Sequence, residues 1–276
     1  MTHSIVWDPS IGIDLGFFTI RYYSLMFLIA FVAGWYLMKA IFVRENESLE
    51  KMDKLLIYMI VSTLLGARLG HVLFYEHELF FTDPLSVFLP FQFAPTFEFT
   101  GFRGLASHGA TIGIAIALFL YAKRVDKRSP AWIFDRIVIP ISFGAIFVRL
   151  GNFLNSEIIG KPTGSDYGVI FKQLGENFPR HPAQLYEAGC YLLLFLLLYF
   201  LYWKTDIRKK GGMLFGIFFS VLWTIRFFVE YSKEPQIKER ADWLFNTGQI
   251  LSIPMVLVGL LVIYLSYNQY RKNEAA

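Results

Sequence analysis

Seven apolar runs, each long enough to cross a bilayer, dominate this 276-residue chain and limit what it can fold into. A crossing takes about 20 residues as a helix, which satisfies its own backbone hydrogen bonds in lipid. Only 17% of the residues are charged, against about 25% in soluble domains. We therefore predict an all-α integral membrane protein in which residues 1–276 form one membrane domain. The seven predicted transmembrane helices lie at residues 18–42, 54–75, 105–123, 131–150, 184–203, 213–231 and 248–267.

The connections between these runs differ in their content of lysine and arginine. Every second connection, together with the carboxyl-terminal segment, holds twice as many lysines and arginines as the remaining connections. Basic connections stay in the cytoplasm, which predicts an outside amino terminus and a cytoplasmic carboxyl terminus. An odd number of spans requires the same arrangement. Because the basic residues lie in short connections, the net charge of +4 does not indicate a nucleic-acid partner.

Two of the predicted outside connections are long. Residues 76–104 contain eight phenylalanines and three prolines, and they form no apolar stretch continuous enough for a span. Aromatic rings favour the headgroup level of a bilayer, so we expect an interfacial aromatic arm here. Residues 151–182 are rich in glycine, proline and polar residues, and we expect them to form a small outside-facing cap.

Polar side chains gather at the predicted outer ends of six spans. An arginine in a membrane helix costs roughly 2.5–3.5 kcal/mol on insertion scales, and its guanidinium fork suits a phosphate. We therefore predict a site for an anionic headgroup in the outer leaflet. The polar residues that converge there are Tyr23, Arg68, His71, Tyr75, His108, Arg149, Asn152, Gln184, Glu187, Arg226 and Glu230.

Simpler roles fit the charged residues of this set equally well at this stage. Arg68 and Arg149 lie near predicted helix ends, where an arginine can extend its head group to the interface and do nothing more. Arg226 and Glu230 are four residues apart, a spacing that also suits an internal ion pair.

The third predicted span begins with a Ser-His-Gly sequence. His108 lies at its water-facing start and could carry a proton near neutral pH. Gly109 and Gly113 have the spacing of close helix contacts, which we prefer to a catalytic role. His71, inside the second span, is more typical of a hydrogen-bonded packing histidine.

Motifs for other chemistries are absent from the sequence. Cys190 is the only cysteine, so no disulfide can form within the chain. The sequence has no Gly-rich phosphate loop, no HExxH and no GxSxG motif. We therefore expect no metal and no cofactor, and a phospholipid headgroup is the simplest anion for the site.

Several segments of the chain, in order, resemble one bacterial family. GAIFVRLGNFLNSEIIGKPT at 144–163 resembles the signature of the phosphatidylglycerol–prolipoprotein diacylglyceryl transferases. RYYSLMF at 21–27, GARLGHVLFY at 66–75, RGLASHGATIG at 103–113, RHPAQLYEA at 180–188, RFFVEYSKEP at 226–235 and TGQILSIPM at 247–255 are similar to further motifs of that family.

The resemblance implies a transferase of lipoprotein biosynthesis. Its donor would be phosphatidylglycerol, and its acceptor the lipobox cysteine in the signal peptide of a prolipoprotein. The reaction would leave a thioether and release glycerol phosphate. The enzyme would be a multi-pass protein of the bacterial cytoplasmic (inner) membrane, with its active site toward the outer leaflet.

The resemblance also implies roles for individual residues. Arg149 and Arg226 would hold the phosphate, with His108 as candidate base and Tyr23 as an essential partner. The phosphatidylglycerol site would further include Asn152, Glu157, Gly160, Glu230, Arg68 and Tyr75, with less defined places for Gln184 and Glu187.

Two positions depart from the family pattern, and two other classes of function remain open. Ala110 follows His108-Gly109 where the family has a second glycine, and Val148 replaces a glycine before Arg149. An anion or lipid transporter would need polar residues through the whole bilayer depth, whereas here they gather at one side. A lipid-binding protein without catalysis would not need His108.

Overall fold

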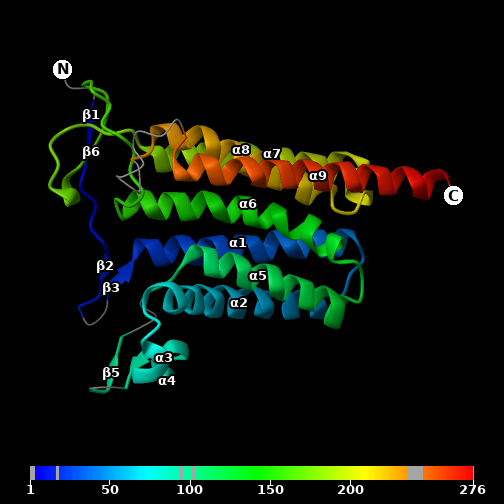
Figure 1. Cartoon of the computed structure of the whole chain (residues 1–276), viewed down its shortest axis with the longest axis horizontal. Coiled ribbons are helices and arrows are strands. Elements are labelled where there is room, and N and C mark those ends of the chain that lie inside the picture. The colour runs from blue at the N-terminus through cyan, green and yellow to red at the C-terminus, as the bar shows by residue number, and fades with distance from the viewer. Residues whose placement is uncertain (1–3, 17–18, 94–95, 101–103, 235–244, 276) are drawn as a thin grey trace. The chain divides into compact units, whose positions relative to one another are not determined.

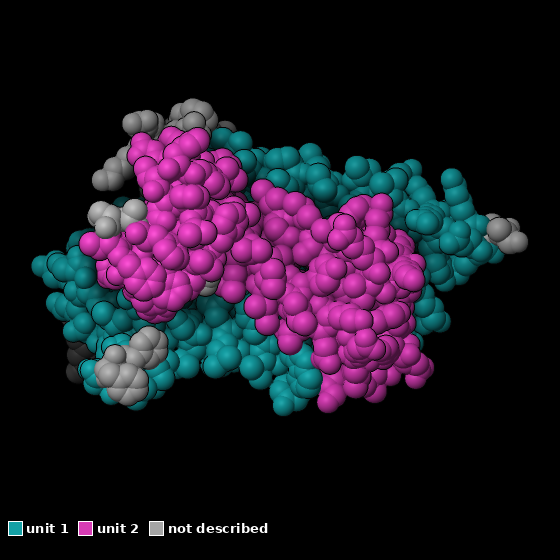
Figure 2. Space-filling model, turned by 90° about the horizontal axis from the view of Figure 1, so that it is seen from below, with its two compact units in different colours: residues 1–38, 134–276 teal, residues 39–133 magenta. Residues whose placement is uncertain are grey.

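The computed structural model describes residues 4–16, 19–93, 96–100, 104–234 and 245–275. The chain divides into two compact units, Met1–Met38 with Phe134–Ala276 (unit 1) and Lys39–Ile133 (unit 2), which are coloured separately in Figure 2. The unit boundaries fall inside two long helices, α1 (Tyr22–Arg44) and α6 (Pro130–Leu154). Residue 18 of the first predicted span and residues 94–95 and 101–103 of the predicted arm lie outside the described residues.

Six helices of the described chain are long and apolar enough to cross a membrane. They are α1, α2 (Leu49–Tyr75), α6, α7 (Ala183–Lys204), α8 (Met213–Val229) with the turn that follows it, and α9 (Thr247–Ala275) (Figure 1). The remaining predicted span, 105–123, forms α5 (Ser107–Tyr121) and continues into a π-helical turn, Ala122–Asp126. The prediction of an all-helical integral membrane protein is confirmed, and a seventh crossing stays a prediction.

Large apolar side chains remain exposed along the helices of unit 1. Leu193 of α7 is 68% exposed and Leu257 of α9 is 61% exposed. In the most apolar stretch of α9, only 17% of the residues are buried within the protein. A soluble monomer rarely exposes large contiguous apolar patches. These exposed side chains are therefore suited to contact with the acyl chains of a bilayer.

Small residues bring α1 and the second half of α6 together within unit 1. The two helices run antiparallel, because Gly144 faces Ala30 and Gly151 faces Tyr23. A Cβ atom added at Gly151 would lie 2.8 Å from the Tyr23 ring, closer than real Cβ contacts come. Glycine at 151 therefore lets the Tyr23 ring approach the carboxyl end of α6.

Helices α7, α8 and α9 lie side by side in unit 1 (Figure 1). Close approach of α8 and α9 again depends on glycine, since a Cβ at Gly216 would lie 2.8 Å from Ile263. At the amino end of α8, the buried carboxylate of Asp135 accepts hydrogen bonds from the backbone N–H groups of Gly212 and Phe215, at 2.7 and 2.8 Å. Asp135 therefore satisfies orphan donors at the start of a helix.

Short strands tie the amino terminus to the segment between α6 and α7. Strand β1 (Ser4–Trp7) pairs in parallel with β6 (Gly168–Phe171), while β2 (Gly12–Asp14) and β3 (Thr19–Arg21) form an antiparallel pair. The Trp7 indole donates a hydrogen bond to the Phe153 carbonyl at 3.0 Å. The predicted cap region therefore contains packed structure.

Unit 2 is centred on the antiparallel contact of α2 with α5. Gly66 and Gly70 of α2 face Gly109 and Gly113 of α5, and a Cβ added at Gly70 would lie 2.6 Å from the Gly109 Cα atom. Backbones approach this closely only where side chains are absent. The predicted packing role of Gly109 and Gly113 is confirmed.

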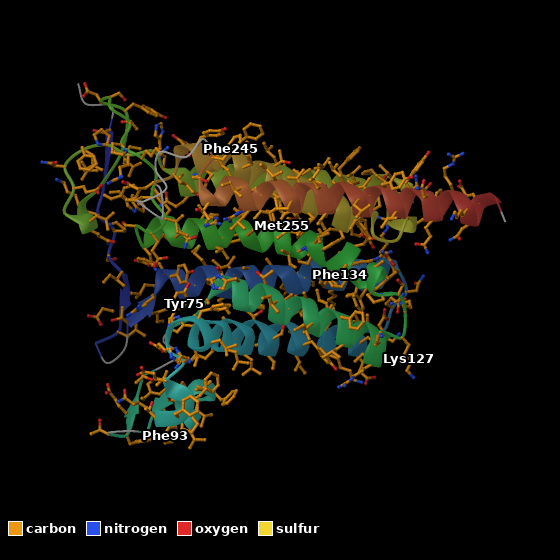
Figure 3. The ribbon with its side chains drawn as sticks, viewed as in Figure 1. Tyr75, Phe93, Lys127, Phe134, Phe245 and Met255 are labelled. Atoms are coloured by element: carbon orange, nitrogen blue, oxygen red, sulfur yellow. The ribbon has the colours of Figure 1, made fainter. Side chains whose placement is uncertain are left out.

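The segment after α2 folds into two short helices and a strand pair: α3 (Leu79–Thr82), α4 (Pro84–Phe88), β4 (Phe91–Gln92) and β5 (Glu98–Phe99). The Asp83 carboxylate accepts a hydrogen bond from the Phe93 backbone N–H at 2.8 Å; Phe93 is labelled in Figure 3. Phe81 is 88% exposed, and Phe91 stacks on Phe97 with ring centroids 5.5 Å apart.

Candidate active site

A fully buried glutamate lies between two cations in unit 1. Glu187, in the first turns of α7, places Oε2 2.8 Å from Arg149 Nε and Oε1 2.9 Å from Lys233 Nζ. The Tyr191 hydroxyl donates to Oε1 at 3.4 Å. A buried carboxylate is costly unless it is paired, and each oxygen of Glu187 lies beside one cation.

A chain of amide and carboxylate contacts holds the other side of Arg149. Its Nη1 donates to Asn152 Oδ1 at 3.2 Å, and Asn152 Nδ2 donates to Glu157 Oε2 at 3.1 Å. Tyr23 of α1 lies beside the Asn152 side chain. The Gln184 side chain donates to the Glu157 carbonyl at 2.5 Å. These bonds fix the direction of the guanidinium group.

Gly160 lies where two backbone segments pass close together. Its N–H donates to the His181 carbonyl at 3.1 Å, and it forms a bridge with Lys233. A Cβ at this position would approach the Ser232 carbonyl oxygen to 2.8 Å. Gly160 therefore helps to bring the segment that carries Lys233 against the chain that follows α6.

Arg180 reinforces the same junction from outside the membrane-spanning segments. It donates to both oxygens of Glu176, at 2.5 and 2.6 Å, and pairs with Glu234. The hydrogen bonds from Arg180 to Glu176 raise the pKa of the guanidinium, which thus stays charged. Its contact with the Gly160 carbonyl, at 3.0 Å, joins the segment just before α7 to the predicted site residue Gly160.

The predicted alternative of an Arg226–Glu230 ion pair is not what the structure contains. Glu230 lies 3.5 Å from Lys233, and among the described residues no carboxylate forms an ion pair with Arg226. The guanidinium carbon of Arg226 lies 5.3 Å from the centre of the Trp223 ring. Arg226 also interacts electrostatically with Tyr191, whose ring centre is 5.9 Å from the guanidinium carbon of Arg149. Tyr191 therefore lies within electrostatic range of both arginines.

Sequence reasoning missed two members of this cluster. Lys233 is only 4% exposed, although it lies in a connection that the distribution of basic residues predicts to be outside. Tyr191 lies four residues after Glu187 in an apolar run. The position of Lys233 three residues after Glu230 was a possible sequence signal for an ion pair. Tyr191 offered no sequence signal beyond its position one helical turn after Glu187.

The remaining predicted site residues belong to unit 2. Arg68 donates to the Ser86 carbonyl at 3.2 Å and lies 3.5 Å from Glu76, so it contacts the segment after α2. Tyr75, labelled in Figure 3, has its ring 6.5 Å from the exposed His108 ring. His71 lies between these groups, 3.5 Å from Glu76 and with its ring 5.2 Å from that of Tyr75.

The structure thus gathers the predicted site residues into two groups. Unit 1 brings together Tyr23, Arg149, Asn152, Glu157, Gly160, Arg226 and Glu230, and unit 2 brings together Arg68, Tyr75 and His108. Within the described part of the chain, no group of three or more His, Cys, Asp or Glu side chains is placed to hold a metal ion. The unit 1 group offers several N–H donors around an arginine pair, an arrangement that suits a phosphate.

Comparison with known proteins identifies the family. The family model described as prolipoprotein diacylglyceryl transferase matches residues 10–265. The phosphatidylglycerol–prolipoprotein diacylglyceryl transferase of Tolumonas auensis is 39% identical over 259 residues, covering 94% of this chain and 95% of the relative. The proteins of the same name from Chloroherpeton thalassium and Bacteroides fragilis are 39% and 37% identical, covering 99% and 95% of this chain and 98% and 95% of their own lengths. This chain belongs to the prolipoprotein diacylglyceryl transferase family.

Proposed function

We propose that this chain is a membrane transferase that moves the diacylglyceryl group of phosphatidylglycerol to a cysteine thiol of a prolipoprotein. The observation that carries the proposal is the pair of arginines from different helices, Arg149 and Arg226, both beside Tyr191 in a family whose relatives bear this name. The reaction belongs to lipoprotein biosynthesis. The acceptor is the lipobox cysteine of the signal peptide.

In this reaction a thiolate sulfur attacks the sp³ glyceryl carbon that carries the phosphate. A C–S bond forms, the C–O bond to phosphate breaks, and the electron pair leaves on the phosphate oxygen as glycerol phosphate. Alignment of sulfur with carbon and neutralisation of the departing phosphate lower the barrier. Two arginines supply that neutralisation, and their effect is larger where water is sparse.

Arg149 and Arg226 are the proposed phosphate ligands. A guanidinium has five N–H groups, so the contacts of Arg149 with Glu187 and Asn152 leave donors for a phosphate. Asn152 and Glu157 orient Arg149, and Tyr23 supports Asn152. Further proposed members of the phosphatidylglycerol site are Gly160, Glu230, Arg68 and Tyr75.

His108 is the proposed base that takes the thiol proton. It is exposed at the start of α5, and an imidazole can accept a proton near neutral pH. A free thiol has a pKa of about 8.5, so a base increases the thiolate fraction at pH 7.

We further propose seven crossings, including α5, with an outside amino terminus and a cytoplasmic carboxyl terminus in the inner membrane. The distribution of basic residues supports this orientation. The site then opens toward the outer leaflet, residues 151–182 form the cap, and residues 76–104 form an arm in the interface. The exposed ring of Phe81 supports the interfacial position of the arm.

The deciding experiment mixes the purified protein with phosphatidylglycerol and a lipobox peptide and measures the mass of the peptide. The expected product carries one diacylglyceryl group, and a peptide with serine in place of the cysteine stays unchanged. Failure to form the adduct in several detergents and in lipid nanodiscs would refute the proposal.

A further inference from the structure

Three buried side-chain atoms on α8 have no hydrogen-bond partner among the described residues: Ser220 Oγ, Trp223 Nε1 and Arg226 Nε. The Ser220 hydroxyl can both donate and accept, whereas Trp223 and Arg226 offer only N–H donors. The two residues are three positions apart, so they lie on one face of the helix. The guanidinium carbon of Arg226 is 5.3 Å from the centre of the Trp223 ring.

The chemistry of these two groups specifies what would satisfy them. Indole and guanidinium nitrogens only donate hydrogen bonds, so the missing partner must be an acceptor. The carboxylates of the neighbouring cluster already lie beside cations, Glu187 beside Arg149 and Lys233, and Glu230 beside Lys233, although Glu187 Oε2 accepts no hydrogen bond among the described residues. An unpaired buried donor is destabilising, which favours an acceptor supplied by a ligand.

The Trp223 ring also orients Arg226. The face of an indole attracts a guanidinium, and Phe219 contacts the Trp223 ring edge-to-face with centroids 6.1 Å apart. Phenylalanine could provide the same aromatic face, but it has no N–H. Replacing Trp223 with phenylalanine therefore removes the N–H donor and keeps the aromatic face.

We propose that the Trp223 indole N–H donates a hydrogen bond to a phosphate oxygen of phosphatidylglycerol, beside the oxygen bound by Arg226. This inference rests on the proposed function, because it assumes that the same headgroup is held by Arg226. Trp223 is then a binding residue for the lipid donor, and it does not contact the peptide.

The first test is kinetic and uses Trp223→Phe with Trp203→Phe as matched control. Trp203 lies in the last turn of α7, at the end opposite to Glu187. A hydrogen bond to a charged group is worth about a ten-fold change or more, so we expect KM for phosphatidylglycerol to rise about ten-fold in Trp223→Phe. The kcat value falls as well if the hydrogen bond strengthens while the phosphate gains charge, KM for the peptide stays near wild type, and Trp203→Phe leaves all three unchanged.

The second test observes the donor itself. The chain has six tryptophans, so ¹⁵N labelling gives six indole resonances, and Trp223→Phe identifies one of them. We expect the Trp223 indole proton to shift downfield on addition of phosphatidylglycerol and to stay unchanged with diacylglycerol, which lacks the phosphate. If Trp223→Phe does not fold, incorporation of 3-benzothienylalanine at position 223 keeps the shape of indole and removes only the N–H.

The outcomes separate this inference from the proposed function. An unchanged KM together with an indole resonance that ignores phosphatidylglycerol would mean that solvent satisfies the donor, and would overturn the inference. A wild-type protein that binds the lipid and shifts this resonance, but forms no peptide adduct, would refute the proposed function and leave the inference standing.

Discussion

Arg149 is held by more contacts than an interfacial anchor needs. Its Nε faces Glu187 and its Nη1 faces Asn152, two acceptors that a lysine cannot reach with the same geometry. We therefore predict that Arg149→Lys lowers the transfer rate at least about 100-fold, the usual cost of removing a donor that stabilises a transition-state charge. The rate of adduct formation measures this effect.

The matched control is Arg124→Lys, at an exposed position in the π-helical turn, and we expect it to keep the wild-type rate. Thermal unfolding in detergent checks that Arg149→Lys is folded. Arg149→Ala should also lose nearly all activity, but it removes a partner of the buried Glu187, which costs about 3–5 kcal/mol in buried pairs. A folded Arg149→Lys protein with full activity would remove Arg149 from the phosphate site.

His108 allows a prediction about pH. If His108 takes the thiol proton, His108→Gln should be slow at pH 7 and recover as the pH rises toward about 8.5, where the thiol ionises without help. The wild-type rate should change less over the same range, because its base already supplies thiolate. Rates of adduct formation across this range give the measurement, with His77→Gln, at an exposed position, as control. Wild-type activity of His108→Gln at pH 7 would rule out the base role.

The polar cluster could be predicted only in part from the residues. The spacing of Arg226 and Glu230 also suited an ion pair, but α8 ends at Val229 and the chain continues as a tighter 3₁₀ turn, Glu230–Ser232. Lys233 therefore comes to within 3.5 Å of Glu230 and 2.9 Å of Glu187. The contact between Lys233 and Glu187 cannot be predicted from local sequence spacing, because the two residues are 46 positions apart.

At the scale of elements, the α2–α5 contact depends on four glycines. A Cβ at Gly70 would lie 2.6 Å from the backbone of Gly109, so the helices must separate to accept alanine there. We predict that Gly70→Ala destabilises the protein by about 1–3 kcal/mol, the usual cost of overpacking. Gly189→Ala is the matched control, because its Cβ would meet nothing within 4 Å and alanine favours a helix by up to about 1 kcal/mol.

Unfolding in detergent, followed by thermal melting or by denaturant, measures the two glycine variants. The expected order of stability is Gly189→Ala at or above wild type, and Gly70→Ala below it. Equal stability of Gly70→Ala and wild type would mean that the glycine contact does not limit how closely the two helices approach.

The helices were more predictable than their ends and the short strands. An apolar run marks only the part of a helix that lies in hydrocarbon. Helix α2 begins at Leu49, before the predicted start at 54, because a helix outside lipid can contain the charged residues of its first turns. The third run continues from α5 into a π-helical turn that hydropathy cannot distinguish from α-helix. Strand β1 pairs with β6 across more than 160 residues of sequence, and neither four-residue strand gives a local signal.

At the scale of the whole molecule, the orientation in the membrane decides which compartment supplies the peptide. The excess of basic residues in one set of connections predicts that Ser10 is outside and Ser129 is cytoplasmic. Both residues are exposed, so Ser10→Cys and Ser129→Cys should label well with a maleimide, in a Cys190→Ala background that removes the only native thiol. In intact spheroplasts, a membrane-impermeant maleimide should label Ser10→Cys alone, and both variants should react after lysis. Labelling of Ser129→Cys in intact cells with protection of Ser10→Cys would reverse the orientation, and the arginine pair would then have to draw phosphatidylglycerol from the inner leaflet.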